Sequence, residues 1–231
     1  MNTKLARRIF EVVYPLFTYY IMYYCLQLFF ASLFIDSFGS LFCLCLAAVC
    51  CIPVQYRFYR KVNIIRSVEP LEGRQWLICI GWIIGIVLLG VACNLAVSRL
   101  PLAEVSEGYE TTSQILNDGS LFLKILTNAC LVPVLEELLY RGIICGQIEA
   151  WGGVSPSKWE ENPMLHRGCI IAAVVVSALI FGALHMNVVQ FLYAGFLGLF
   201  LGAAYVSTHR LWVVIAAHGL TNLMVILATS L

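Results

Sequence analysis

The sequence contains few charged residues. Only 12% of its 231 residues are Asp, Glu, Lys or Arg, while 61% are hydrophobic, and an ordinary soluble domain carries about a quarter charged residues. The formal net charge is +1, which provides no electrostatic basis for binding nucleic acid. This scarcity of charge excludes an ordinary soluble domain, so we predict an integral membrane protein whose surroundings are a lipid bilayer and which has no nucleic-acid partner.

Other features are absent as well. The chain has no evident low-complexity tract or internal repeat, so a single membrane domain over residues 1–231 is the simplest division. The first apolar segment lacks a small-residue cleavage site, and we interpret it as a retained span, not a cleaved signal peptide. Cysteine is plentiful, but all ten cysteines lie in or beside apolar segments and are interpreted as small hydrophobic residues.

Apolar runs long enough to cross a hydrocarbon core of about 30 Å recur along the chain. They lie near residues 9–34, 38–55, 76–97, 120–144, 168–186, 188–206 and 212–230. The predicted fold is therefore all-α, a polytopic bundle of about 7 (7–8) transmembrane helices around a polar intramembrane cavity.

The basic residues indicate the orientation of the chain. If the N-terminus is cytoplasmic, every Lys and Arg except Arg99 and Lys124 falls on the inner side. This distribution obeys the positive-inside rule and favours a membrane protein with a cytoplasmic N-terminus. It also places the acidic segment 101–120 outside and the basic segment 55–74 inside, the latter as an amphipathic stretch on the inner leaflet or as a solvated loop.

Charges are concentrated in "PVLEELLYR", residues 133–141, inside an otherwise apolar run. Each acid or arginine at bilayer depth costs about 2.5–3.5 kcal/mol, so a function is expected for them. Glu137 and Arg141 are four residues apart, the spacing of a helical ion pair, and are predicted to support the fold. Glu136 has no local cation, so it requires a partner on another helix, a proton, or a water-filled cavity.

Two further polar clusters lie in later spans. "FGALH" places Phe181 and His185 on one helix face, and "HGLTN" does the same for His218 and Asn222. Together with Glu136 they could hydrolyse an amide, because a carboxylate can take a proton from water while imidazole and amide groups stabilise an oxyanion. Taken singly, an intramembrane histidine or asparagine is more often an interhelical hydrogen-bonding residue.

Two other histidines receive no role. His166 and His209 lie in basic segments that the predicted topology places at the inner face, where contact with solvent or lipid headgroups is expected.

The ordered motifs "EELLYR", "FGALH" and "HGLTN" resemble the CAAX protease and bacteriocin-processing (CPBP) family of intramembrane endopeptidases. The resemblance covers residues 120–228, the expected catalytic core, whereas the first hundred residues match only in being transmembrane. It implies cleavage of a membrane-associated peptide or protein, of the CAAX type or of the bacteriocin or signal-peptide type. The implied roles are water activation by Glu136 with His185, an oxyanion site of His218 and Asn222, and support from Glu137, Arg141 and Phe181.

Metal dependence stays open at this point. Members of the family have been described both as metalloproteases and as glutamate-dependent proteases, and this sequence has no His-Glu-x-x-His motif. We expect no cofactor, and the alternative is zinc held by Glu136, His185 and His218, which would have to converge from three helices.

Two non-protease alternatives also stay open: an immunity or scaffold protein without catalysis, and a small transporter or proton pathway. A protein freed from catalysis has no reason to retain a buried Glu136, which disfavours the first. The absence of two matched halves disfavours the second.

Helix lengths add one structural prediction. With linear spans, Glu136 lies about 12 Å from the inner end of its segment, but His185 lies about 25 Å from the inner end of its own. The two side chains can meet if the fourth helix continues past Gly142 to about Ala150, or if one helix is broken around the cavity. We favour the continued helix and predict that Glu136, His185, His218 and Asn222 line one hydrated cavity.

Overall fold

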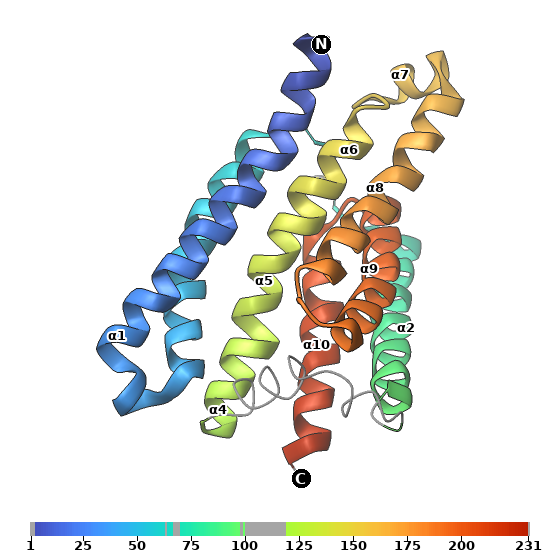
Figure 1. The fold of residues 1–231 in the computed structure, drawn as a ribbon. Helices are drawn as coiled ribbons and strands as arrows, with labels where there is room; N and C mark the ends of the chain where they lie inside the picture. Colours follow the sequence, from blue (N-terminus) through green and yellow to red (C-terminus); the bar gives the residue numbers. More distant parts are fainter. Residues whose placement is uncertain (1–2, 63, 67–69, 98, 100–118, 231) are drawn as a thin grey trace.

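The computed structural model describes residues 3–62, 64–66, 70–97, 99 and 119–230. In this part of the chain the regular elements are all helices, which confirms the predicted all-α class (Figure 1). The acidic segment 101–120 lies outside the described residues except for its last two positions, Gly119 and Ser120.

The first helix, α1 (Thr3–Lys61), folds back on itself at Gly39, where the backbone has φ 79° and ψ 173°. Only glycine adopts this conformation without strain, so the residue separates the two predicted spans 9–34 and 38–55 into the two arms of a hairpin (Figure 1). Buried Gln55 on the second arm donates its side-chain amide to the Pro15 carbonyl on the first at 3.3 Å. The basic segment 55–74 thus starts as the end of α1.

The second helix is α2 (Gly73–Val97). Between α1 and α2, the described positions 64–66 and 70–72 are irregular, so the amphipathic stretch considered for this region is not found as a helix there.

The third long helix carries the acidic motif and is built from α4 (Leu121–Lys124), the π-helix η2 (Ile125–Leu131), α5 (Val132–Glu137), the π-helix η3 (Leu138–Cys145) and α6 (Gly146–Ala150). Each junction residue has right-handed helical angles, so the backbone runs on without a break. We call residues 121–150 the motif helix. At 1.5 Å per residue it is about 45 Å long, and its end at Ala150 confirms the prediction of a continued helix.

The chain continues with a short α7 (Pro156–Glu161) and three long helices, α8 (Pro163–Ala183), α9 (Val188–Thr208) and α10 (Leu211–Ser230). Asparagine caps begin two of them: Asn162 Oδ1 accepts from the Leu165 amide at 3.1 Å, and Asn187 Oδ1 accepts from the Gln190 amide at 2.8 Å. Such caps satisfy amides that a helix N-terminus leaves unpaired.

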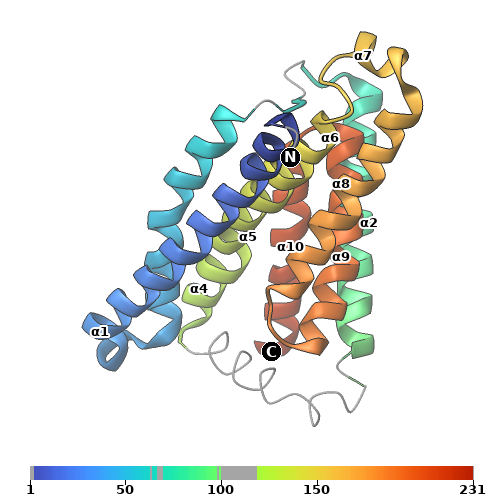
Figure 2. The same ribbon diagram turned by 45° about the horizontal axis from the view of Figure 1, so that its top comes forward.

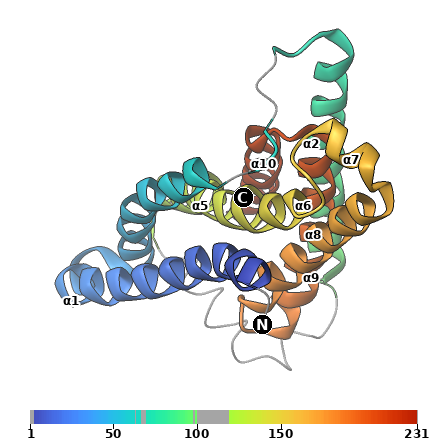
Figure 3. The ribbon, with the colours of Figure 1, turned by 90° about the horizontal axis from the view of Figure 1, so that it is seen from above.

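The motif helix lies between the α1 hairpin on one side and α8, α9 and α10 on the other (Figures 1 and 2). It contacts each of these helices, while α8 packs on α9 and α10 packs on α2. Seen from above, α5 and α6 run through the middle of the assembly (Figure 3). The motif helix is therefore a neighbour of both other helices that carry the sequence motifs, α8 and α10.

The outer surface of the bundle is apolar. On α1, the large side chains of Phe17, Ile21, Tyr24 and Leu28 are between 55% and 62% exposed and follow one another at helical spacing. Among the described residues, five helices are long and apolar enough to cross a membrane: α1, α2, α8, α9 and α10. Apolar groups outside and charged groups inside are the arrangement that lipid favours, and the protein is an integral membrane protein.

Candidate active site

Glu137 is the centre of a buried ionic network. Its Oε1 accepts from Arg141 Nη1 at 2.7 Å and from His218 Nδ1 at 2.8 Å. The side chains of Glu137 and Arg141 are both 0% exposed, so the ion pair predicted from their spacing is present and is fully removed from solvent. The contact with His218, which joins the motif helix to α10, was not predicted.

Arg141 also fastens the motif helix to α8 and α9. Its Nη2 donates to the Gly198 carbonyl at 3.2 Å, and its guanidinium carbon lies 4.6 Å from the centre of the Phe181 ring. A Cβ at position 198 would lie 3.1 Å from Nη2, so glycine is what allows α9 to approach the arginine this closely. The guanidinium is thereby held by a carboxylate, a carbonyl and an aromatic face.

Glu136 finds its partner on α10. Its Oε2 lies 3.8 Å from His218 Nε2, too far for a direct hydrogen bond but within ion-pair range. Its side chain is 15% exposed, in contrast to the fully enclosed Glu137. His218 therefore lies between two carboxylates, with one ring nitrogen facing each.

His185 is oriented by its own helix end. It follows α8 directly, and its Nδ1 lies 2.8 Å from the Phe181 carbonyl oxygen. Because a carbonyl can only accept, Nδ1 carries the hydrogen and Nε2 of the neutral ring is left as an acceptor. The Phe181 ring lies 5.1 Å from the His185 ring and 5.8 Å from the His218 ring, so it packs against both histidines.

Asn222 contacts the motif helix through the backbone carbonyl of Asn128. In η2 the Val132 amide donates to the Thr127 carbonyl, five residues back. The next residue in that register is Pro133, which has no N–H to offer the Asn128 carbonyl. Asn222 Nδ2 donates to that carbonyl at 2.8 Å, and the second hydrogen of the same amide remains for another acceptor.

Gly219 explains how α10 reaches this part of the motif helix. A Cβ at position 219 would lie 2.5 Å from the Ala129 carbonyl oxygen, closer than a carbon atom can approach. Glycine in "HGLTN" therefore permits the close packing that brings His218 and Asn222 to the motif helix.

The first helix contributes residues that the sequence motifs did not identify. Tyr20 and Tyr140 share a hydrogen bond between their hydroxyl groups at 2.7 Å, and the Glu136 carboxylate interacts electrostatically with both, as well as with Tyr19 and Tyr23. The signal available in the sequence was the tyrosine-rich run "TYYIMYY" within an apolar span.

The predicted residues thus fall into one connected group. Glu136, Glu137, Arg141, Phe181 and His218 are linked by the contacts above, and His185 joins them through Phe181 and through its electrostatic interaction with Glu136. Asn222 lies one turn from His218 on α10 and also faces the motif helix. A shared hydrated cavity stays a prediction.

The two histidines without an assigned role have specific partners. His209 Nε2 lies 2.9 Å from Oε1 of Glu149, whose side chain is 1% exposed, so His209 is not simply solvated as expected. His166 stacks on Trp159 with 4.6 Å between ring centres.

A zinc site would need three protein side chains close enough to bind one ion. Among the described residues, no three side chains of His, Cys, Asp or Glu are grouped closely enough to hold one metal ion. Glu136, His185 and His218 do not form a three-ligand site in this arrangement, so no step below involves a metal.

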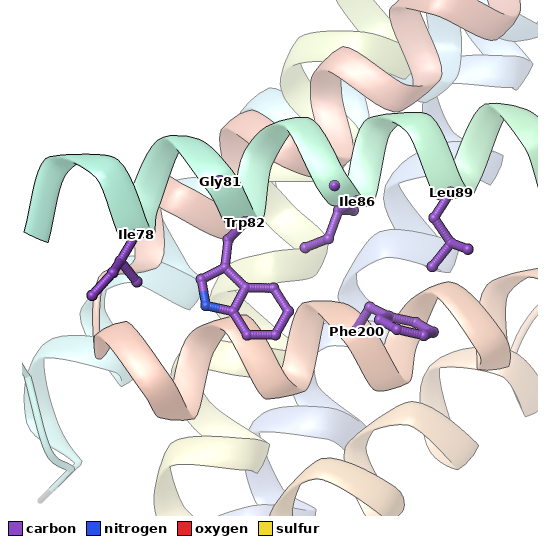
Figure 4. Close-up of a pocket in the computed structure, with 7 residues that line it drawn as sticks. Ile78, Gly81, Trp82, Ile86, Leu89 and Phe200 are labelled. Atoms are coloured by element: carbon purple, nitrogen blue, oxygen red, sulfur yellow. The ribbon is translucent and has the colours of Figure 1, made fainter.

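A separate apolar groove lies between α2 and α9, with a volume of about 530 Å³. Figure 4 shows Trp82 and Phe200 among its lining residues, which also include Gly81 and Gly85. It contains none of the predicted site residues.

Part of the chain is similar to a known protein family. Residues 118–224 match the family model described as "Type II CAAX prenyl endopeptidase Rce1-like", and this range contains all three motifs. The match supports the CPBP family for this part of the chain. The resemblance drawn from the motifs is thereby confirmed.

A curated relative points the same way. The chain is 24% identical over 152 residues to the "Putative membrane peptidase YdiL" of Bacillus subtilis (strain 168). The aligned region is 66% of this chain and 54% of the relative, so the chain spans about half the length of the curated relative that it matches. No solved structure matches the chain significantly. Together, the family model and the relative support a membrane protease in general.

Proposed function

We propose that this protein is an intramembrane endopeptidase in which Glu136 activates the attacking water. The observation that carries the proposal is the position of His218, which lies between Glu136 at 3.8 Å and Glu137 at 2.8 Å. A structural histidine needs one partner, whereas this one directs its second nitrogen toward a partly exposed carboxylate.

The proposed reaction begins with water held between Glu136 and His185. The free Nε2 of His185 accepts a hydrogen bond from the water, which orients it, and the Glu136 carboxylate accepts the proton as the water oxygen attacks the peptide carbonyl carbon. Glu136 then returns that proton to the leaving amine as the carbon–nitrogen bond breaks. The products are a carboxylic acid and an amine, and Glu136 is regenerated.

The oxyanion of the tetrahedral intermediate requires donors in place before the reaction. Asn222 has one amide hydrogen left after it donates to the Asn128 carbonyl. His218 donates from Nδ1 to Glu137, and when protonated it can also donate from Nε2. Because Glu137 holds His218 and the Asn128 carbonyl holds Asn222, the donors need little reorganisation during the reaction.

The charges of this arrangement balance. The Glu137 carboxylate faces the Arg141 guanidinium, so these opposite charges cancel within the buried network. A neutral sum matters here because uncompensated charge is costly at bilayer depth.

The proposed substrate is a membrane-associated peptide or protein of the CAAX type or of the bacteriocin or signal-peptide type. The bacterial relative and the distribution of basic residues support a bacterial plasma membrane location with the N-terminus in the cytoplasm. The family description refers to a prenyl endopeptidase, which supports the CAAX type.

The test is cleavage of membrane-associated peptides by purified protein, with Glu136→Gln as the decisive variant. This change keeps the size of the side chain but removes the proton acceptor, so cleavage should fall by about 10²–10⁴-fold while peptide binding survives. Glu160→Gln, at an exposed acid on α7, is the matched control and should cleave normally. Equal cleavage before and after Glu136→Gln would refute the proposal, and a cellular role that survives the change would favour the immunity or scaffold alternative.

Metal dependence is measured in the same assay. Treatment with a strong chelator should leave cleavage unchanged if the site works without a metal. Loss of activity that is restored by adding zinc would instead establish the alternative in which Glu136, His185 and His218 ligate zinc.

A further inference from the structure

A pair of tyrosine hydroxyl groups joins α1 to the motif helix. The Tyr20 and Tyr140 oxygens are 2.7 Å apart, although the residues are 120 positions apart in sequence. Tyr140 is only 2% exposed, and its ring packs on Phe181 with 4.9 Å between centres. The Tyr20 ring packs edge-on against Tyr19 at 4.8 Å. Both hydroxyl groups are therefore held in place by aromatic packing.

Tyr140 lies on the same side of the motif helix as Glu136. The two residues are four positions apart, about one turn, and residues at this spacing are neighbours on a helix surface. The Glu136 carboxylate interacts electrostatically with both hydroxyl groups of the pair. The pair is thus directed to the face of the motif helix that carries the proposed base.

Counting hydrogens shows that the pair has a donor to spare. Two hydroxyl groups carry two hydrogens, and the bond between them uses one. The remaining hydrogen belongs to a group in a largely buried setting, where an unpaired donor is costly. Glu136 is the carboxylate that acts on both hydroxyl groups, and a carboxylate is the strongest acceptor for such a donor.

We propose that Tyr140, held by Tyr20 of α1, is a positioning residue that donates a hydrogen bond to the Glu136 carboxylate. One carboxylate oxygen is then fixed by the tyrosine, and the other is left to accept the proton of the attacking water. The inference rests on the proposed function for its kinetic consequences. It makes α1, which lies outside the matched residues 118–224, a part of the site.

The kinetic test uses Tyr140→Phe, Tyr20→Phe and the double variant, each of which removes only hydroxyl groups. Tyr140→Phe should lower kcat by about 10- to 100-fold, the effect of losing a hydrogen bond to a charged group, with KM nearly unchanged. Tyr20→Phe should lower kcat less, and the double variant should be no worse than Tyr140→Phe, because the two hydroxyl groups act as one unit.

The matched control is Tyr24→Phe. Tyr24 lies on the same helix as Tyr20 but is 62% exposed on the apolar outer surface, so its loss should change neither kcat nor KM. A drop in kcat for Tyr24→Phe equal to that for Tyr20→Phe would overturn the inference, since the effect would then belong to α1 in general. If Tyr140→Phe does not fold, Tyr20→Phe, at a residue less buried than Tyr140, carries the test.

A second measurement does not depend on cleavage. The infrared band of the Glu136 carboxyl group can be assigned as the band that disappears in Glu136→Gln, and Tyr140→Phe should shift it while Tyr24→Phe leaves it unchanged. An unshifted band would overturn the inference even if the protein is an active protease. A shifted band in a protein that cleaves no peptide would uphold the tyrosine contact and refute the proposed function instead.

Discussion

Two ion pairs in this protein share a spacing along the helix but lie in opposite surroundings. Glu137 and Arg141 are both 0% exposed and 2.7 Å apart, whereas the side chains of Arg7 and Glu11 are 81% and 30% exposed and 3.0 Å apart. An exposed pair contributes at most about 1 kcal/mol, while removing one partner of a buried pair costs about 3–5 kcal/mol. Identical spacing along a helix therefore does not indicate how much an ion pair contributes to stability.

The acids of both pairs have a second partner on another helix. Glu11 accepts from Gln147 on the motif helix, and Glu137 accepts from His218 on α10. The difference lies in what happens when a partner is lost, because Glu11 can be hydrated and Glu137 cannot. Loss of one partner of the buried pair should therefore destabilise the bundle more than loss of one partner of the exposed pair.

Breaking the buried pair is expected to have the largest effect on stability. Arg141→Ala leaves the Glu137 carboxylate without its cation inside the bundle and should lower the free energy of unfolding by about 3–5 kcal/mol. Thermal unfolding of the purified protein in detergent measures the loss. Glu137→Gln combined with Arg141→Met removes both charges and should unfold less readily than Arg141→Ala alone. Unchanged stability with abolished turnover would mean that Arg141 acts on the reaction and not on the fold.

Removing the side-chain amide of Asn222 on α10 tests the proposed oxyanion site. Asn222→Ala should lose about 2.7–4 kcal/mol of transition-state stabilisation, the range found where oxyanion donors have been removed, with little change in substrate affinity. Steady-state kinetics would show the effect in kcat. Thr221→Val, at a buried neighbour that only bonds to the Ala217 carbonyl of its own helix, is the control. A loss confined to KM would assign Asn222 to substrate binding.

Adding one methyl group to α10 should separate the helices. Gly219→Ala places a Cβ 2.5 Å from the Ala129 carbonyl oxygen, and such overpacking costs about 1–3 kcal/mol. The matched control is Gly81→Ala, where a Cβ meets nothing within 4 Å. We expect Gly219→Ala to lower both the unfolding temperature and kcat, and Gly81→Ala to lower neither. Equal behaviour of the two variants would contradict the close packing of α10 on η2.

Breaking the exposed pair should have the smallest effect. Arg7→Ala removes the guanidinium from Glu11, and the free energy of unfolding should fall by less than about 1 kcal/mol. Thermal unfolding at low and high salt would show the small difference disappearing as screening increases. A loss as large as that of Arg141→Ala would mean that exposure does not distinguish the two pairs.

Much of the fold was predictable because lipid imposes a simple rule on sequence. A span needs about 20 apolar residues whose backbone groups are all paired within the helix, so the predicted segments 168–186, 188–206 and 212–230 correspond to α8, α9 and α10. The gap between the first two predicted runs, residues 35–37, lies close to the observed turn at Gly39. The length of the motif helix followed from the requirement that Glu136 and His185 meet.

Predictions about the site succeeded where the contact is local. Glu137 and Arg141 pair within one helix, and His185 contacts Phe181 four residues earlier. Contacts between helices were harder to predict, because the spacing of residues along one helix does not determine the angle and distance at which it packs on another. The bonds from Glu137 to His218 and from Asn222 to the Asn128 carbonyl were therefore missed.

The sequence by itself determined that this chain enters a membrane and which segments become helices. It also determined which polar residues are so costly at bilayer depth that a function is expected for them. These properties depend on the transfer of single residues and on helical periodicity, both of which are local. The tertiary structure alone decided that His218 lies between Glu136 and Glu137, and that Tyr20 of α1 meets Tyr140. The first of these contacts is possible because glycine at position 219 lets α10 close on the motif helix, and close packing is a property of the assembled helices together.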